Sequence, residues 1–108
     1  MGKLSAAQKE KRDFRKSKAW EKFRHLVYVA QSGIDIITHK KLYSGCNCHH
    51  CDLREKNYKK IDDISRFCML NKKTHELVHW IFPYYDKDPA VIDRLITVLE
   101  NMKRCSND

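Results

Sequence analysis

The stretch Cys46-Asn-Cys-His49-His50-Cys51 and a second stretch, Asn71-Lys-Lys-Thr-His75-Glu-Leu-Val-His79, together hold four of the six histidines of this 108-residue chain. The first is predicted to be extended and to enter a loop, and the second to open a helix. Histidines at positions i and i+4 of a helix lie on one face, with β-carbons roughly 6 Å apart. That separation suits two imidazoles that share one metal ion, and a third imidazole from the loop would complete the site.

The order and spacing of these histidines resemble the HNH (ββα-metal, His-Me finger) endonucleases, especially their small phage-type members. The shared pattern is His49-His50, then about 25 residues, then His75-x3-His79. The resemblance continues upstream through Trp20-x2-Phe23-Arg24-x2-Val27 and Asp35-x2-Thr38-x3-Leu42, and it covers about residues 17–82. An isolated HxxxH occurs often by chance, so the ordered set carries the resemblance.

The resemblance implies a role for each histidine of the two stretches. His50 matches the general base, and one divalent metal ion (Mg²⁺, Mn²⁺, Ni²⁺ or Zn²⁺) is expected at His49, His75 and His79. The register of the central Asn of the family falls on Ser65-Arg66 in this chain. Ser65 could orient His50 by a hydrogen bond, or Arg66 could instead contact phosphate.

The cysteines are candidate ligands for a second kind of metal site. Five is an odd number, and the cytosol disfavours structural disulfides, so thiols or metal ligands are expected. Cys46, Cys48 and Cys51 could be small buried apolar residues or could bind a structural Zn²⁺ together with His75 or His79. The paired CxxC knuckles of many HNH proteins are missing from the chain, so no complete four-cysteine zinc ribbon is expected.

Positive charge is concentrated at the N-terminus. Residues 1–24 contain nine Lys or Arg and three Asp or Glu, whereas residues 25–108 contain thirteen and eleven, for a total net charge of +8. A basic arm on a near-neutral body suggests a polyanionic partner such as DNA. The alternative is a solvated basic face without a partner. The candidate DNA-binding residues are Lys9, Lys11, Arg12, Arg15, Lys16 and Lys18.

The N-terminal half is predicted to contain a hairpin and, before it, a long helix whose first part, through Lys18, could be a loose helix or an arm. Ser5-Ala-Ala-Gln8 has the form of a capping box, and no Gly or Pro interrupts the chain from there to about Gln31. Residues 34–37 and the segment around residues 42–43 favour strands joined by a turn at residues 39–41. Residues 46–50 are expected to be strand-like.

The C-terminal half is predicted to be mainly helical. Residues 62–70 could be a short helix or an extended piece, followed by a helix that Asn71 or Thr74 caps and that Pro83 ends. Asp88-Pro89 is expected to start a last helix, which runs to about Lys103. Its apolar stripe should serve in packing and contains Ala90, Val91, Leu95, Val98, Leu99 and Met102. Trp20, Phe23 and Trp80 are expected in the core.

These observations predict a small α+β protein, with a basic N-terminal arm or helix (residues 1–16) and one HNH-type domain (residues 17–108). The domain is expected to have a ββα-metal core and a C-terminal amphipathic helix. The expected function is that of a metal-dependent DNA endonuclease or nickase, phage-encoded, with DNA and a packaging or other protein as partners. The alternatives are a non-catalytic, treble-clef-like zinc module that binds nucleic acid and a helical interaction protein.

The location of the protein follows from what the N-terminus lacks. Its first 25 residues are mostly charged or polar, so no signal peptide is expected, and the chain has no apolar run long enough to span a bilayer. The protein is therefore expected in the cytoplasm, that of the host cell if a phage encodes it, and away from membranes.

Overall fold

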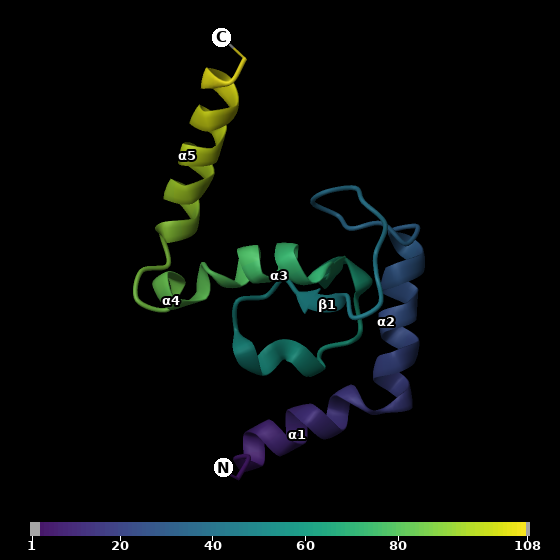
Figure 1. Cartoon of the computed structure of the whole chain (residues 1–108). Coiled ribbons are helices and arrows are strands. Elements are labelled where there is room, and N and C mark those ends of the chain that lie inside the picture. The colour runs from purple at the N-terminus through teal and green to yellow at the C-terminus, as the bar shows by residue number, and fades with distance from the viewer. Residues whose placement is uncertain (1–2, 108) are drawn as a thin grey trace. The chain divides into compact units, whose positions relative to one another are not determined.

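The computed structural model describes residues 3–107, without the side chains of residues 55 and 56. Residues 1, 2 and 108, which belong to the ranges predicted for the arm and the domain, lie outside this part. In chain order the elements are α1 (Ala6–Arg15), α2 (Lys18–Ala30), β1 (Asn47–His50), η1 (Glu55–Lys59), η2 (Ile64–Arg66), β2 (Phe67–Leu70), α3 (Lys72–His79), α4 (Phe82–Tyr85) and α5 (Val91–Cys105), where η denotes a 3-10 helix (Figure 1).

Helices and a small antiparallel sheet make the chain an α+β protein, as predicted. By its internal contacts it forms two compact units, residues 1–75 and 76–108, and the boundary falls within the continuous helix α3. In the described residues, no helix combines the length and the apolar character needed to cross a membrane.

The core of the first unit lies between α2 and the sheet. Phe23 and Val27, one turn apart on α2, are buried together with Phe67 and Met69 of β2 and with Leu42 from the intervening loop. The rings of Phe23 and Phe67 meet edge to face, with centroids 4.9 Å apart. Burial of these side chains from water therefore holds α2 against β2.

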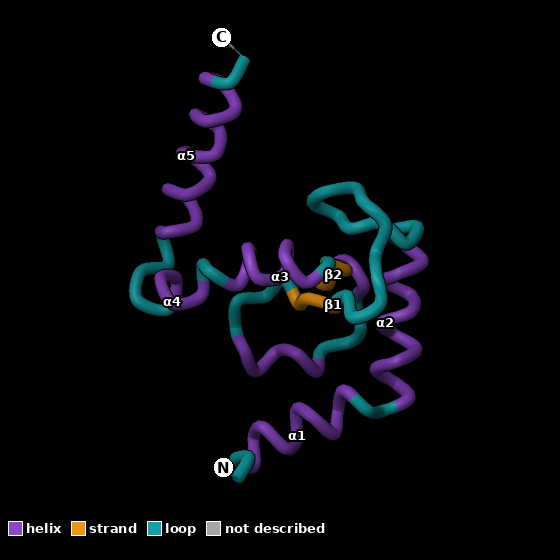
Figure 2. Tube along the Cα trace, in the orientation of Figure 1, coloured by secondary structure: helices purple, strands orange, loops and turns teal. Residues whose placement is uncertain are grey.

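Strands β1 and β2 pair antiparallel, as Figure 2 shows in orange. His49 lies opposite Cys68, and His50 lies opposite Phe67. Because successive side chains of a strand point to opposite faces, His50 shares the α2 face with Phe67, whereas His49 points to the other face. The predicted extended character of residues 46–50 is confirmed, and residues 62–70 contain both alternatives, η2 followed by β2.

The long N-terminal helix predicted from the sequence is interrupted, which corrects that prediction. The capping box at Ser5 and Gln8 is present, but α1 ends at Arg15 and α2 begins at Lys18. The hydroxyl of Ser17 accepts from the backbone N–H of Trp20 at 3.2 Å and donates to the carbonyl of Phe14 at 2.6 Å. Ser17 thus satisfies backbone groups at both helix ends.

The predicted hairpin is also wrong, because residues 34 and 41 form only an isolated bridge. The Oδ1 atom of Asp35 accepts from the backbone N–H groups of Ile37 and Thr38, at 2.8 and 3.0 Å. An Asp side chain that binds the backbone two residues on produces a turn instead of a strand. The preference of the following isoleucines for β-structure is overridden by this local turn.

The second carboxylate oxygen of Asp35 reaches the start of α3. Oδ2 accepts from the backbone N–H of Asn71 at 2.8 Å and from the hydroxyl of Thr74. Asp35 is fully buried. Burial by itself would raise the pKa of Asp35, but the hydrogen bonds from Thr74 and from the backbone of Thr38, Asn71 and Ile37 outweigh it and lower the pKa to about 2.

Helix α3 begins at Lys72, directly after Asn71 as predicted, but two other predicted helix boundaries are shifted. The side chain of Asn71 does not cap α3, because its amide binds Tyr43 N and Lys41 O in the preceding loop. Helix α3 already ends at His79, and Pro83 instead lies in the first turn of α4. Helix α5 begins at Val91, later than the predicted Asp88-Pro89, since Asp88 Oδ1 accepts from the backbone N–H of Ala90 at 3.1 Å and stabilises a turn.

Apolar side chains of the second unit are largely exposed. Trp80, predicted to be in the core, is 71% exposed. It follows the last residue of α3 and lines a shallow pocket with Glu76, His79 and Pro83. Leu95, Leu99 and Met102 of the predicted α5 stripe are also exposed. The expected packing role of these residues is therefore not realised in the described chain.

We predict that Asp35→Asn destabilises the first unit by about 2–4 kcal/mol, since it leaves buried donors poorly paired. The folded-state pKa of Asp35, about 2, lies below the ordinary value of 3.8 for an aspartate. Its stabilising effect is therefore present above the pKa of the unfolded state and is lost as the pH falls towards about 2. Denaturant unfolding at several pH values measures this.

The exposed Asp62 provides a control for this prediction. Asp62→Asn should change the free energy of unfolding by less than about 0.5 kcal/mol, as is usual at the surface. Equal effects of the two substitutions, or a cost of Asp35→Asn that does not shrink in acid, would contradict the role given to Asp35.

Candidate metal centre

The first histidine of the candidate centre comes from strand β1. His49 points to the face of the sheet that lies away from α2, and its ring meets that of His75 on α3 edge to face, with centroids 5.3 Å apart. The register of β1 with β2 determines which face His49 occupies, and the turn at Asp35 anchors the start of the helix that carries His75. Two segments distant in sequence thus present imidazoles to each other.

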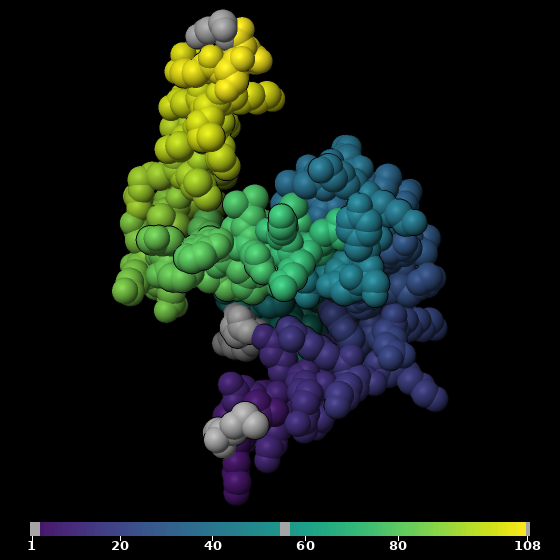
Figure 3. Space-filling view, viewed as in Figure 1, coloured from purple at the N-terminus to yellow at the C-terminus, as the bar shows by residue number. Residues whose placement is uncertain are grey.

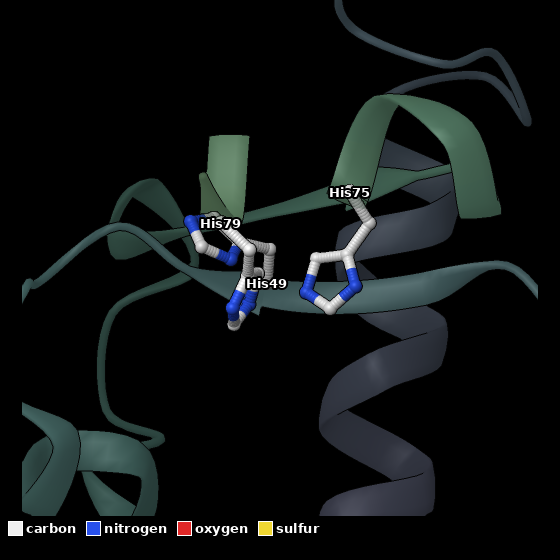
Figure 4. Close-up of side chains that lie close together, drawn as sticks. All are labelled: His49, His75 and His79. Atoms are coloured by element: carbon white, nitrogen blue, oxygen red, sulfur yellow. The ribbon is translucent and has the colours of Figure 1, made fainter. Parts of the chain in front are cut away.

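The third histidine follows one turn further along α3. His79 lies four residues after His75 on the same continuous helix, so the two side chains share a helix face. Ligand atoms of His49, His75 and His79 all lie within 4.8 Å of one another, and Figure 4 shows the three side chains close together. The three residues predicted to bind metal are therefore brought together.

This set of donors could hold one metal ion. Imidazole nitrogens bind Zn²⁺ at about 2.0–2.1 Å, and a tetrahedral ion with three protein ligands keeps one position open for water or substrate. At such bond lengths the nitrogens are ~3.4 Å apart, so small ring rotations would gather them around an ion. In the described part of the chain, no other group of three or more His, Cys, Asp or Glu side chains meets the same distance criterion.

His50, the predicted general base, lies on the opposite face of the sheet. Its ring is nonetheless nearly parallel to that of His49, at 10°, with centroids 6.0 Å apart. The Nδ1 atom of His50 is buried and has no hydrogen-bond partner in the described structure. His50 lines a small cavity together with Phe14, Arg15, Trp20, Cys48, Tyr58 and Phe67.

Neither of the residues that match the family Asn position is hydrogen-bonded to His50. The hydroxyl of Ser65 donates to Asp63 Oδ1 at 2.7 Å, and an orienting contact of Ser65 with the base stays a prediction. This bond and the one from the backbone N–H of Ser65 lower the pKa of Asp63. Arg66 is exposed, and its carbonyl accepts from the backbone N–H of Cys51 at 2.7 Å. A phosphate contact by Arg66 stays a prediction.

Asn57 is a buried polar residue in a segment that was predicted from the sequence only as a polar loop. Its side-chain amide donates to Asp52 Oδ2, while Asp52 Oδ1 accepts from the backbone N–H of Arg54 at 2.9 Å. These bonds to Arg54 and Asn57 lower the pKa of Asp52. The pair Asp52 and Asn57 therefore shapes the loop that leaves β1 directly after His50. Its only sequence signal is an Asp and an Asn five residues apart.

The cysteines do not form the structural zinc site considered above. All five are free thiols. Cys46 and Cys48 pack against the hydrophobic core, and Arg24 donates to the carbonyl and sulfur of Cys46. Burial raises the pKa of the Cys48 thiol to about 12. Cys51 lies an odd number of residues after Cys46 and Cys48, so its side chain belongs to the other face of the sheet. The sulfurs of the three cysteines therefore do not surround one common point.

Cys51 instead lies beside Cys68, a residue for which the sequence predicted no functional role. The two sulfurs are 3.8 Å apart. Hydrogen bonding to Cys68 lowers the pKa of Cys51 to about 7, against the opposing effect of burial, and the same pairing raises the pKa of Cys68.

The candidate DNA-binding residues line the N-terminal helices. Lys9, Arg12 and Arg15 are exposed on α1, whose purple atoms lie at the surface in Figure 3. Lys16 and Lys18 flank the break at Ser17 and are also exposed. Lys11 differs, since its ammonium group lies 5.4 Å from the centroid of the Tyr58 ring.

Comparison of the chain with models of known protein families found no match, and comparisons with curated proteins and with solved structures found no significant one.

We predict that His75→Ala and His79→Ala each lower the affinity for Zn²⁺ at least ~10-fold, because each removes a donor. His25→Ala, at an exposed position on α2, is the matched control and should bind as the unaltered chain does. Isothermal titration with Zn²⁺ and the metal content after dialysis measure the effect. Unchanged binding by both helix variants would show that these residues are not ligands.

Proposed function

We propose that the chain is a metal-dependent DNA endonuclease or nickase of the HNH (ββα-metal) type. The observation that carries this proposal is the gathering of His49, His75 and His79, next to the ring of a fourth histidine, His50. Two antiparallel strands followed by α3 are compatible with a ββα layout. The pattern of motifs upstream of the histidines supports the same family.

Phosphodiester hydrolysis needs a deprotonated water, charge stabilisation at the phosphoryl group and help for the leaving oxygen. A divalent metal at the three histidines would supply the last two. His50 is proposed to take the proton from the attacking water, because its ring is the histidine ring next to the proposed ligand His49, with centroids 6.0 Å apart. Its Nδ1 makes no hydrogen bond to the described protein, so its acid–base capacity is not committed to a structural contact.

Access to His50 involves the basic helix. Phe14 and Arg15 of α1 line the same small cavity as His50. Helix α1 therefore lies beside His50, and its exposed Lys9, Arg12 and Arg15 are suited to phosphate contacts. The proposed roles of the arm and of the base thus concern one region of the first unit.

The alternative of a treble-clef-like zinc module has less support. Such a module depends on cysteine ligands for its fold, whereas Cys46 and Cys48 face the core and Cys51 does not join them. The variants that test the nuclease proposal also test this alternative. Zinc bound through cysteines, without any cleavage, would favour the module.

We predict that His50→Gln lowers the rate of plasmid cleavage by about 10²–10⁴, the usual effect of losing a general base. Metal content and fold should be preserved, because His50 is outside the ligand set. Single-turnover nicking with Mg²⁺, Mn²⁺, Ni²⁺ or Zn²⁺, and with EDTA as a blank, measures the rate.

Two matched variants make this test decisive. His49→Gln should lose both metal and activity, whereas His25→Gln on α2 should retain both. If His50→Gln cuts at the normal rate while His49→Gln keeps metal but not activity, the two roles are exchanged. Normal cleavage by both would refute the proposed mechanism.

The basic arm gives a separate prediction about binding. Neutralising Lys9, Arg12 and Lys16 with Gln should weaken DNA binding and flatten its salt dependence. Each lost phosphate contact reduces the log–log slope by ~0.9, so three contacts would reduce it by up to about 2.7. Fluorescence anisotropy with duplex DNA at several salt concentrations measures the slope.

A charge-matched control distinguishes contact from net charge. The triple variant Lys87→Gln, Lys103→Gln and Arg104→Gln removes the same three positive charges from the second unit. It should leave the slope nearly unchanged. Equal slopes for the two triple variants would show that α1 has no special contact with DNA.

A further inference from the structure

The thiols of Cys51 and Cys68 form a pair that the proposed hydrolysis does not use. Their sulfurs are 3.8 Å apart, and a disulfide bond is ~2.0 Å long, so they need to approach by only ~1.8 Å. Cys51 is exposed and can meet a small reagent, whereas Cys68 is half-buried behind it. One accessible thiol with a second thiol in contact is the arrangement of an attacking and a resolving cysteine.

The sheet holds the two residues in this relation. Cys68 lies opposite His49 in the ladder, and the backbone N–H of Cys51 donates to the carbonyl of Arg66 at 2.7 Å, which continues the pairing beyond the end of β1. Cys51 and Cys68 are therefore diagonal neighbours on one face of an antiparallel pair. Their proximity is built into the strand register, so it does not depend on a mobile contact.

We propose that Cys51 and Cys68 are a thiol–disulfide modification site that reacts with small disulfides of the glutathione type. The sulfur of Cys51 attacks one sulfur of the reagent, which forms a mixed disulfide and releases one small thiol. The sulfur of Cys68 then attacks Cys51, which forms the Cys51–Cys68 bond and releases the second small thiol. The protein loses two electrons and two protons, and the reagent disulfide gains them.

The other cysteines lack one or both of these features. Cys46 and Cys48 pack against the core, and the sulfur of Cys46 is hydrogen-bonded by Arg24. Cys105 is exposed on α5, in the second unit, and has no cysteine within the same helix. We therefore expect Cys46 and Cys48 to react more slowly or incompletely with small disulfides. Cys105 is expected to stop at a mixed disulfide.

The test is a reaction of the metal-free full-length chain with glutathione disulfide, followed by alkylation and mass spectrometry of a non-reduced digest. The expected product is a peptide that links Cys51 to Cys68, with a mass loss of ~2 Da relative to the dithiol. Alkylation of Cys51 should then fall roughly ten-fold or more. An unlinked Cys51 after reaction, or a link from Cys51 to a different cysteine, would overturn the proposal.

Two variants separate the pair from general thiol reactivity. In Cys68→Ser, the resolving step is lost, so Cys51 should remain as the mixed disulfide with glutathione. In Cys105→Ser, the Cys51–Cys68 link should form as in the unaltered chain. A persistent mixed disulfide on Cys51 in the unaltered chain, equal to that in Cys68→Ser, would show that Cys68 does not resolve it. Because these readouts need neither metal nor DNA, they do not depend on the proposed nuclease activity.

Discussion

The carboxylate of Asp35 joins the parts of the first unit that position the candidate site. One oxygen accepts two backbone N–H groups of its own loop, and the other binds Asn71 and Thr74 at the start of α3. A buried carboxylate is costly unless its lone pairs are satisfied, so the loop and the helix start must stay together for Asp35 to remain buried. His75 lies one residue beyond Thr74, and its placement opposite β1 therefore depends on this bond network.

The second constraint is the register of β1 with β2. Because side chains alternate along β1, His49 points towards His75, whereas His50 points towards Phe67 on the face that packs against α2. A slip of one residue would exchange the faces of the two histidines. Packing of Cys48, on the same strand, against the core of the α2 face opposes such a slip, since a slip of β1 would turn Cys48 away from that core. Hydrophobic packing on one face therefore determines which histidine can act as a ligand on the other.

The sequence predicted the capping box at Ser5 and the strand ending at His50 because each depends on local pattern, and it predicted the gathering of three histidines through the order and spacing that resemble the HNH proteins. The features it missed depend on tertiary contacts or on a competing local bond. The helix break required recognising Ser17 as a cap, although serine is also tolerated inside helices. The turn at Asp35 replaced a hairpin, and Cys68 became a neighbour of Cys51 only through a strand register that no spacing in the sequence reveals.

If the proposed function holds, adjacent histidines on a strand would offer a metal-dependent hydrolase a specific advantage. Three ligands from His49, His75 and His79 leave a tetrahedral ion with an open position for water or phosphate. If His50 pointed to the same face, its imidazole could fill that position and would lose its free lone pair. Strand alternation places His50 on the other face, with its ring centroid 6.0 Å from that of His49. The backbone geometry of β1 would thus separate the proposed ligand from the proposed base without any additional residue.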